Sequence, residues 1–497
     1  MVLFVVISFV LLFLLFCTLL DDLYLIKFKR LPPGPLSLPI IGGLHLLGRE
    51  PYKSVQNMAA KYGGILSLRL GMQERFVYVV DPELAKQLLS SEYLADRPRL
   101  PFFDVLSKEG HGIGSRPYDF TWKLHTRIIY SSISKLIQTQ LDNILQNSEE
   151  HLFKILEGKK GEPILPETEI RTAVLMTMGR FIFGHEYASA DDPKLQLILW
   201  LNEETMKGLQ PVNLINLIPG LQYISLPFYP NYRNLKKAKE RFLNDEFESH
   251  KRNFDGHALD IMDMIIKELE EDEHDSMKFR QKQRKEFLLP QNFLMSIFTL
   301  IVGGEQTLSS NLLWLLLYTA KHQDCQEKIL RELRNNDIVP TDFVQFHNKQ
   351  KFPYTTAFYK ETMRFVSTSY FGIPRTASAD IHVNGFTIPK GTTVFPNFWS
   401  INHNEKYWSQ PHEFQPERFL ELKNLHSPNI PGFIIYGYGR RPCIGSQIAR
   451  ACLFSFLCNT VNKFHVSLPP DEEPDMRGHT QLVIEPPKFK LIFQKRS

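Results

Sequence analysis

Long apolar stretches predict three prominent helices in this sequence. Val2 to Leu20 contains no charged residue and is long enough to span a bilayer as a helix. Pro290 to His322 is apolar on nearly all faces, a pattern that predicts a helix buried at the centre of a large protein. Ile444 to Phe456 predicts a further helix, and the chain from about residue 130 to 285 also has mostly helical patterns.

Shorter stretches predict a few strands. Gly64 to Gly71 alternates in polarity, Phe76 to Val80 is β-branched and aromatic, and the polar residues 72–75 between them indicate a hairpin. Asn384-Gly385 between two short strand-like runs is a strong signal for a second, two-residue hairpin. The pattern as a whole predicts a mainly α fold with a smaller β domain.

The N-terminal apolar segment has the features of a retained membrane anchor. No basic residue precedes it and no small-residue cleavage site follows it, whereas a cleavable signal peptide normally has both. The basic residues that follow place the rest of the chain in the cytosol by the positive-inside rule; they are Lys27, Lys29 and Arg30. We expect an anchor over residues 2–20, a basic and proline-rich hinge over 21–35, and a body over 36–497. A cleaved signal is the alternative.

The composition narrows the class of protein. The chain has 497 residues, of which 43% are hydrophobic and 12% aromatic. No low-complexity linker divides it, which suits one large domain with a lipophilic interior. The net charge of +4 is too small to argue for nucleic acid as a partner. The five cysteines form no CxxC pair and no disulfide framework, which indicates a reducing compartment for the body.

One cysteine lies in a loop suited to special chemistry. Cys443 follows a glycine- and arginine-rich run, Tyr436 to Pro442, and directly precedes a predicted helix. A helix N-terminus favours thiolate, the glycines let backbone approach a flat group, and the arginines suit carboxylates. Together these features describe a heme iron ligand with a clamp for the heme propionates. The alternative is a buried structural cysteine in a surface loop.

The predicted central helix contains an unusual run, Gly303-Gly304-Glu305-Gln306-Thr307. Glycines and polar side chains within a buried helix lower its stability, glycine by about 1 kcal/mol relative to alanine. Such a local conflict is expected at a functional site. The alternative, a kinked helix with an exposed polar patch, fits poorly with a buried helix.

The loop around Cys443 resembles the heme-binding loop of the cytochrome P450 family, in which Gly439, Arg441, Cys443 and Gly445 match and Tyr436 replaces a phenylalanine. The resemblance covers essentially the whole chain and looks closest to animal microsomal members. It includes similarity to arthropod enzymes that metabolise hormones or detoxify foreign compounds. It implies the mainly α cytochrome P450 fold and makes Cys443 the axial ligand of heme b (iron protoporphyrin IX). Arg441 and Gly445 are then cofactor-binding residues.

The run in the central helix resembles the oxygen-activating motif of the same family. Gly303, Gly304 and Thr307 match, and the threonine hydroxyl acts in oxygen activation. Gln306 stands at the position of the usual acid, and Glu305 lies one residue early. The resemblance implies catalytic roles for Thr307, Gln306 and Glu305. Because Glu305 is about 200° from Thr307 around a helix, its side chain points away unless the glycines distort the helix.

Further residues carry roles by resemblance. Arg97, Trp122 and Arg375 match positions that contact the heme propionates. The Trp122 motif departs from the family pattern, because Thr126 holds its arginine position; this weakens the clamp, or a neighbour reaches in instead, either His125 or Arg127. The resemblance also places Glu361, Arg364 and Arg418 in a buried structural triad. It assigns substrate access to Leu201–Ile224 and a pocket-lining hairpin to Gly478–Pro487.

The resemblance implies that the body, 36–497, is a heme-binding catalytic domain. The function would be that of a membrane-anchored heme-thiolate monooxygenase, which inserts one oxygen atom from O2 into a lipophilic small molecule. No nicotinamide- or flavin-binding segment is visible, so the resemblance implies that NADPH–cytochrome P450 reductase, with cytochrome b5 as a further donor, would supply the electrons at the endoplasmic reticulum membrane. A basic face with Arg440, Arg441 and Arg450 would suit an acidic partner. Two alternatives are a heme-thiolate isomerase or dehydratase that needs no O2, and a non-catalytic heme- or lipid-binding member.

Overall fold

A computed structural model describes residues 2–71, 75–99, 102, 112–187, 189–210, 232–274, 290–427 and 429–496. The α-helices are α1 (Val2–Lys27), α2 (Pro51–Tyr62), α3 (Pro82–Ser90), α5 (Phe120–Thr139), α6 (Leu141–Gly158), α7 (Glu167–Phe183), α8 (Pro193–Leu209), α10 (Tyr232–Asn253), α11 (Ile261–His274), α13 (Pro290–Lys321), α14 (Gln323–Asn335), α15 (Pro353–Val366), α16 (Phe398–Asn402), α17 (Glu417–Leu420) and α18 (Ser446–Lys463). Short 3-10 helices cover η1 (Leu44–Leu46), η2 (Glu92–Leu94) and η4 (Phe346–Lys351).

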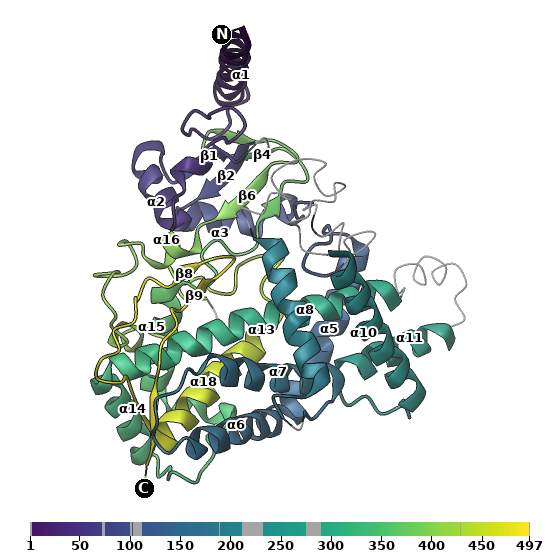
Figure 1. The fold of residues 1–497 in the computed structure, drawn as a ribbon, viewed down its shortest axis with the longest axis vertical. Helices are drawn as coiled ribbons and strands as arrows, with labels where there is room; N and C mark the ends of the chain where they lie inside the picture. The colour runs from purple at the N-terminus through teal and green to yellow at the C-terminus, as the bar shows by residue number, and fades with distance from the viewer. Residues whose placement is uncertain are drawn as a thin grey trace.

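The strands are β1 (Ile65–Arg69), β2 (Arg75–Val79), β3 (Arg375–Thr376), β4 (Ile381–Val383), β5 (Phe386–Ile388), β6 (Thr393–Pro396), β7 (Phe464–Ser467), β8 (His479–Thr480), β9 (Ile484–Glu485) and β10 (Ile492–Lys495). One sheet has four strands in the order β1-β2-β6-β3, and the pairs β4-β5, β7-β10 and β8-β9 are separate. Figure 1 shows the four-stranded sheet at one end of a large helical body. The predicted mainly α fold with a smaller β part is confirmed.

Helix α13 runs through the middle of the helical body (Figure 1). It has 32 residues, and buried side chains occur around its whole circumference from Phe293 to Ala320. Helices α7, α8, α15 and α18 all contact it. This confirms the buried central helix predicted from Pro290 to His322, because only a helix surrounded by protein can bury apolar residues on every face.

Both predicted hairpins form. Strands β1 and β2 pair antiparallel from Ile65 opposite Val79 onward, and residues 72–74 of the predicted turn lie outside the described residues. Strands β4 and β5 also pair antiparallel, and the two residues between them have positive φ, 49° at Asn384 and 79° at Gly385. Two successive positive φ values define the tight turn that Asn-Gly favours. Of the substrate-access segment, residues 211–224 lie outside the described residues.

The N-terminal helix α1 projects from the sheet end of the body (Figure 1). Among the described residues it is the one helix long and apolar enough to cross a membrane. Its Asp22 is buried and pairs with Arg75 at 2.7 Å, and the Ser37 N–H donates to the same carboxylate. The following proline-rich link is fixed as well, because Ser67 Oγ donates to the Pro32 carbonyl at 2.6 Å. The sheet therefore holds the base of α1.

Candidate functional site

The loop that carries Cys443 is shaped by glycines and leads into α18. The Cys443 N–H donates to the Tyr436 carbonyl at 2.8 Å, which closes the loop. Gly439 has a φ of 73°, and a Cβ there would lie 1.9 Å from the Leu89 carbonyl oxygen, so only glycine fits. At Gly445 an added Cβ would meet no atom of the described residues within 4 Å. The loop thus leaves open space beside the cysteine.

The Cys443 side chain is accessible within densely packed surroundings. It is exposed, although the surrounding protein is dense enough that burial raises the pKa of its thiol. The Gly445 N–H and the charge of Arg450 act in the opposite direction and lower that pKa. A thiolate ligand for a flat metal cofactor would need an accessible thiol in such surroundings.

Three arginines gather around this loop. Arg97 donates from Nη1 to the carbonyls of Ile373 and Pro374, both at 2.8 Å, while its Nε is buried without a partner among the described residues. Burial lowers the pKa of Arg97, and the nearby charges of Arg441 and Arg375 lower it further. Desolvated cations that repel one another require an anionic partner. The carboxylates of a heme provide one, so the residues present fit that group.

The other two arginines mainly donate hydrogen bonds to backbone carbonyls. Arg375 donates to the carbonyls of Leu89 and Tyr438, both at 2.7 Å, and burial lowers its pKa to about 10. Arg441 donates to the carbonyls of Ala95 and Arg116, and burial lowers its pKa to about 10 as well. Both side chains therefore fix the cysteine loop to the segments around residues 89–95 and 116.

Trp122 supports Arg441 from helix α5. The Arg441 guanidinium lies 4.4 Å from the Trp122 ring centroid, and the indole N–H donates to the Ile113 carbonyl at 3.0 Å. One α5 neighbour, His125, stacks on Phe293 of α13 at 3.9 Å, and the other, Arg127, is exposed. His125 thus packs against α13, and Arg127 lies at the surface. Neither position supports contact with a heme propionate, the role that the resemblance left open for these two residues.

The segment at Ile113 connects the cysteine loop to α13. Arg441 and Trp122 both donate to the Ile113 carbonyl. A Cβ at Gly114 would lie 2.7 Å from the Thr299 side chain, one helical turn before the motif of α13. Within the motif, Gly303 is exposed, and a Cβ there would meet no described atom within 4 Å. Open space therefore borders both the cysteine loop and the motif.

The three polar residues of the motif point to different partners. Thr307 Oγ1 donates to the Gly303 carbonyl at 2.6 Å. Glu305 is fully buried and accepts from Arg171 of α7 at 2.8 Å, from Asn202 of α8 and from Ser309. Because donors on α7 and α8 occupy its carboxylate, Glu305 does not face the side of Thr307. The expected role of Glu305 in oxygen activation therefore does not fit this geometry. Because α13 continues through the motif as a regular helix, residues 305 and 307 lie on different sides of it.

Gln306 faces the C-terminal hairpin. Its side-chain amide donates to Glu485 Oε1 on β9, and Gln481 donates to Glu485 Oε2 at 3.2 Å. Gln306 and Glu485 line a cavity of about 450 Å³ with residues of α7, α8 and α13. Glu485 was absent from the sequence prediction, since nothing local distinguishes it from other glutamates. The missing acid at position 306 was the one signal that a substitute should be sought.

The predicted triad comes together. Glu361 accepts from Arg364 Nε at 2.7 Å and Nη2 at 2.9 Å, and from Arg418 Nε at 3.1 Å. Glu361 and Arg364 are fully buried and Arg418 nearly so. The arginines also donate to carbonyls of Asn402 and Ser409. The triad thereby joins α15 to the long loop that precedes the cysteine.

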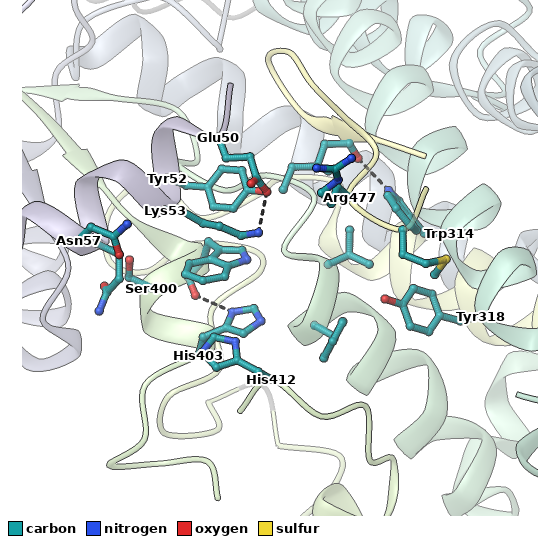
Figure 2. Close-up of a pocket in the computed structure, with 16 residues that line it drawn as sticks. Glu50, Tyr52, Lys53, Asn57, Trp314, Tyr318, Ser400, His403, His412 and Arg477 are labelled. Carbon is teal, nitrogen blue, oxygen red and sulfur yellow. Dashed lines mark hydrogen bonds and ion pairs between the residues drawn. The ribbon is translucent and has the colours of Figure 1, made fainter. Parts of the chain in front are cut away.

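A second cavity of about 450 Å³ lies on the other side of the hairpin, between α2, α13 and α16. Figure 2 shows Tyr52, Lys53 and His403 on one wall and Trp314 and Tyr318 on the other. Burial lowers the pKa of His403 to about 3, so its ring is neutral. Ile484 of the predicted pocket-lining hairpin borders this cavity, but none of the predicted catalytic or cofactor-binding residues lines it.

A family model described as Cytochrome P450 matches residues 32–493. The chain belongs to the cytochrome P450 family. This P450 is 28% identical to a steroid 17-alpha-hydroxylase/17,20 lyase of Ictalurus punctatus, over 94% of this chain and 91% of the relative. It is also 28% identical to cytochrome P450 18a1 of Drosophila melanogaster, over 95% and 88%, and to human cytochrome P450 1B1, over 94% and 87%. It is an oxygen-incorporating oxidoreductase of the heme-thiolate type.

Proposed function

We propose that this P450 is a membrane-anchored heme-thiolate monooxygenase for a lipophilic small molecule. The observation that carries the proposal is the exposed Cys443 thiol beside three desolvated arginines, of which Arg97 keeps a buried Nε without a described partner. Heme b, when bound, supplies the iron at which O2 is reduced. Cys443 would hold the iron and Arg97 a propionate, while Gly445 leaves room for the ring.

The residues of the α13 motif have separate roles. Gly303 leaves space beside α13 for the reacting groups, and the Thr307 hydroxyl holds a proton at the oxygen site. Thr307 Oγ1, which donates to the Gly303 carbonyl, can also accept a hydrogen bond from water. Gln306 does not ionise and positions water through its amide. Glu305 has a structural role, since it anchors α13 to α7 and α8 through Arg171 and Asn202.

The proposed domain organisation is that of an anchored enzyme. Residues 2–20 form the anchor, 21–35 the hinge and 36–497 the catalytic domain at the endoplasmic reticulum membrane, facing the cytosol. Large apolar side chains of α1 are exposed, Phe9 at 70% and Phe13 at 66%, and such a surface suits lipid. The buried Asp22–Arg75 pair sets how the anchor joins the body.

NADPH–cytochrome P450 reductase, with cytochrome b5 as a further donor, supplies the electrons. The cysteine loop reaches α5, where Tyr130 Oη donates to the Cys443 carbonyl at 3.4 Å. Lys123 and Arg127 share that face of α5 and are exposed, as is Arg440. Arg441 is 5% exposed, so it leaves the basic face predicted from the sequence. The exposed cations suit an acidic partner.

The test is turnover of the full-length protein with reductase and NADPH. Progesterone, lauric acid and 7-ethoxycoumarin serve as probes of three lipophilic classes, chosen after a screen for ligand-induced spectral shifts. The proposal expects NADPH-dependent oxygenation of a spectrally active probe. Turnover of that probe without NADPH or O2 would overturn it and favour an isomerase.

A further inference from the structure

An acid is missing from α13, yet a carboxyl group lies beside the gap. Gln306 holds the position of the acid and cannot release a proton at neutral pH. Its side-chain amide donates to Glu485 Oε1, across 179 positions of sequence. Gln481 donates to the second oxygen at 3.2 Å and accepts from Gln210 of the α8 end at 2.8 Å. Two amides therefore bind this one carboxyl group beside α13, and Gln210 supports one of them, Gln481.

Glu305, the neighbouring acid on α13, cannot replace the acid missing at position 306. Both oxygens of Glu305 are engaged by donors from Arg171, Asn202 and Ser309. Arg171 carries a permanent charge, and the carboxylates of Glu305 and Glu203 raise its pKa against the effect of burial. Glu305 is thus engaged in a buried ion pair with Arg171. The partners of Glu485, by contrast, are neutral amides.

Glu485 also has access to solvent. It lines the cavity of about 450 Å³, whose wall on α13 consists of Gln306, Ser309, Ser310 and Leu313. The lining includes the exposed Lys207, His479 and Lys488, so the cavity opens at the surface. A cavity of this size that opens at the surface and is lined in part by polar side chains can hold water.

The surroundings of Glu485 favour its protonated form. Burial raises the pKa of its carboxyl group, and the charges of Glu167 and Glu305 raise it further, against Arg171 and His479, which lower it. Glu203, Lys207 and Lys488 also line the cavity. An acid whose pKa lies above its ordinary value can hold a proton nearer to neutral pH and release it to a base.

We propose that Glu485 is the acid that α13 lacks at position 306, and that it delivers protons toward Thr307 through a water molecule bound by the Gln306 amide. The O–H bond of the Glu485 carboxyl breaks as an O–H bond forms on that water, which passes one of its own protons on toward Thr307. A second water in the cavity then returns a proton to the Glu485 carboxylate. The inference rests on the proposed function and assigns a catalytic acid to the C-terminal hairpin.

Exchanging the two side chains tests the proposal. Glu485→Gln removes the acid and keeps an amide-sized side chain. Gln306→Glu with Glu485→Gln restores a carboxyl–amide pair in the opposite order, so the hairpin stays attached while the acid moves onto α13. Glu473→Gln, an exposed glutamate of the same C-terminal segment, controls for loss of one charge.

The first measurement is the infrared carbonyl band of protonated carboxyl groups as a function of pH, which needs neither substrate nor reductase. Glu485→Gln should lose a titrating component that Glu473→Gln retains. Glu149, whose pKa burial raises to about 8, remains in every variant as an internal reference. A spectrum unchanged by Glu485→Gln would overturn the proposal.

The second measurement is oxygenation of the probe that the wild type oxidises fastest. Glu485→Gln should lower product formed per NADPH consumed by about 100-fold, the lower end of the range for general acid catalysis, and release hydrogen peroxide instead. The exchanged pair should recover most of the wild-type yield. A purely structural contact predicts an unchanged yield in Glu485→Gln, which would refute the proposal. If the wild type shows no NADPH-dependent oxygenation, the proposed function is refuted instead. The infrared result still tests whether Glu485 carries a titrating proton.

Discussion

Removing the charge of Glu361 should be among the most damaging single changes in this P450. The carboxylate is fully buried and accepts four hydrogen bonds, from Arg364 Nε and Nη2, Arg418 Nε and the Gln415 N–H. Glu361→Gln keeps the size of the side chain but leaves two buried guanidinium groups without a counter-charge. Breaking a buried pair in this way costs about 3–5 kcal/mol in free energy of unfolding.

The assay is urea unfolding followed by circular dichroism, with the midpoint converted to free energy through the slope. We expect a lower midpoint with an unchanged slope. Arg477→Gln is the control, because it also removes one member of an ion pair, with Asp475, but both side chains are exposed; its midpoint should stay at the wild-type value. If Glu361→Gln loses no more stability than Arg477→Gln, the triad does not hold the core together.

Four further outcomes follow from the structure. Arg97→Gln should weaken heme retention about 10- to 100-fold, the loss of one hydrogen bond to a charged group, as measured by heme transfer to apomyoglobin. Thr307→Ala should consume NADPH but release hydrogen peroxide in place of product. Although burial alone lowers the pKa of His250, Asp260 and the Glu246 carbonyl raise it to about 9. The stability from this pair is therefore full below about pH 6.5 and declines as the pH rises through 9. His250→Gln should remove that decline in urea midpoints. Protease added to intact microsomes should digest the body, and full protection would place it in the lumen.

The sequence pattern predicted an element of the fold well where a single physical factor, such as burial or turn conformation, determines that element. The central helix was visible because α13 is buried on every side, and the β4–β5 turn because Asn384-Gly385 suits two positive φ values. The position of α18 was approximate: the apolar run began at Ile444, but the helix starts at Ser446 after the cysteine loop.

The site could be predicted only in part, because its contacts join distant segments. The cysteine loop and the triad have short motifs, so residue type and spacing suffice to name them. Apart from Ser309, the partners of Glu305 and Gln306 lie at least 103 positions away, on α7, α8 and β9, and no local pattern reveals them. The same holds for Arg441, whose burial against Trp122 removes it from the basic surface that its neighbours in sequence suggested.

The ferrous–carbonyl absorption spectrum of Cys443→Ala tests the central claim most directly. Thiolate ligation alone gives the red-shifted band, and Cys443 is the one cysteine in the glycine-rich loop, whereas Cys325, Cys452 and Cys458 are buried elsewhere. We expect wild type to show this band, Cys458→Ala to retain it, and Cys443→Ala to lose it. If a red-shifted band survives in Cys443→Ala, another residue is the heme ligand and the assignment of Cys443 is wrong.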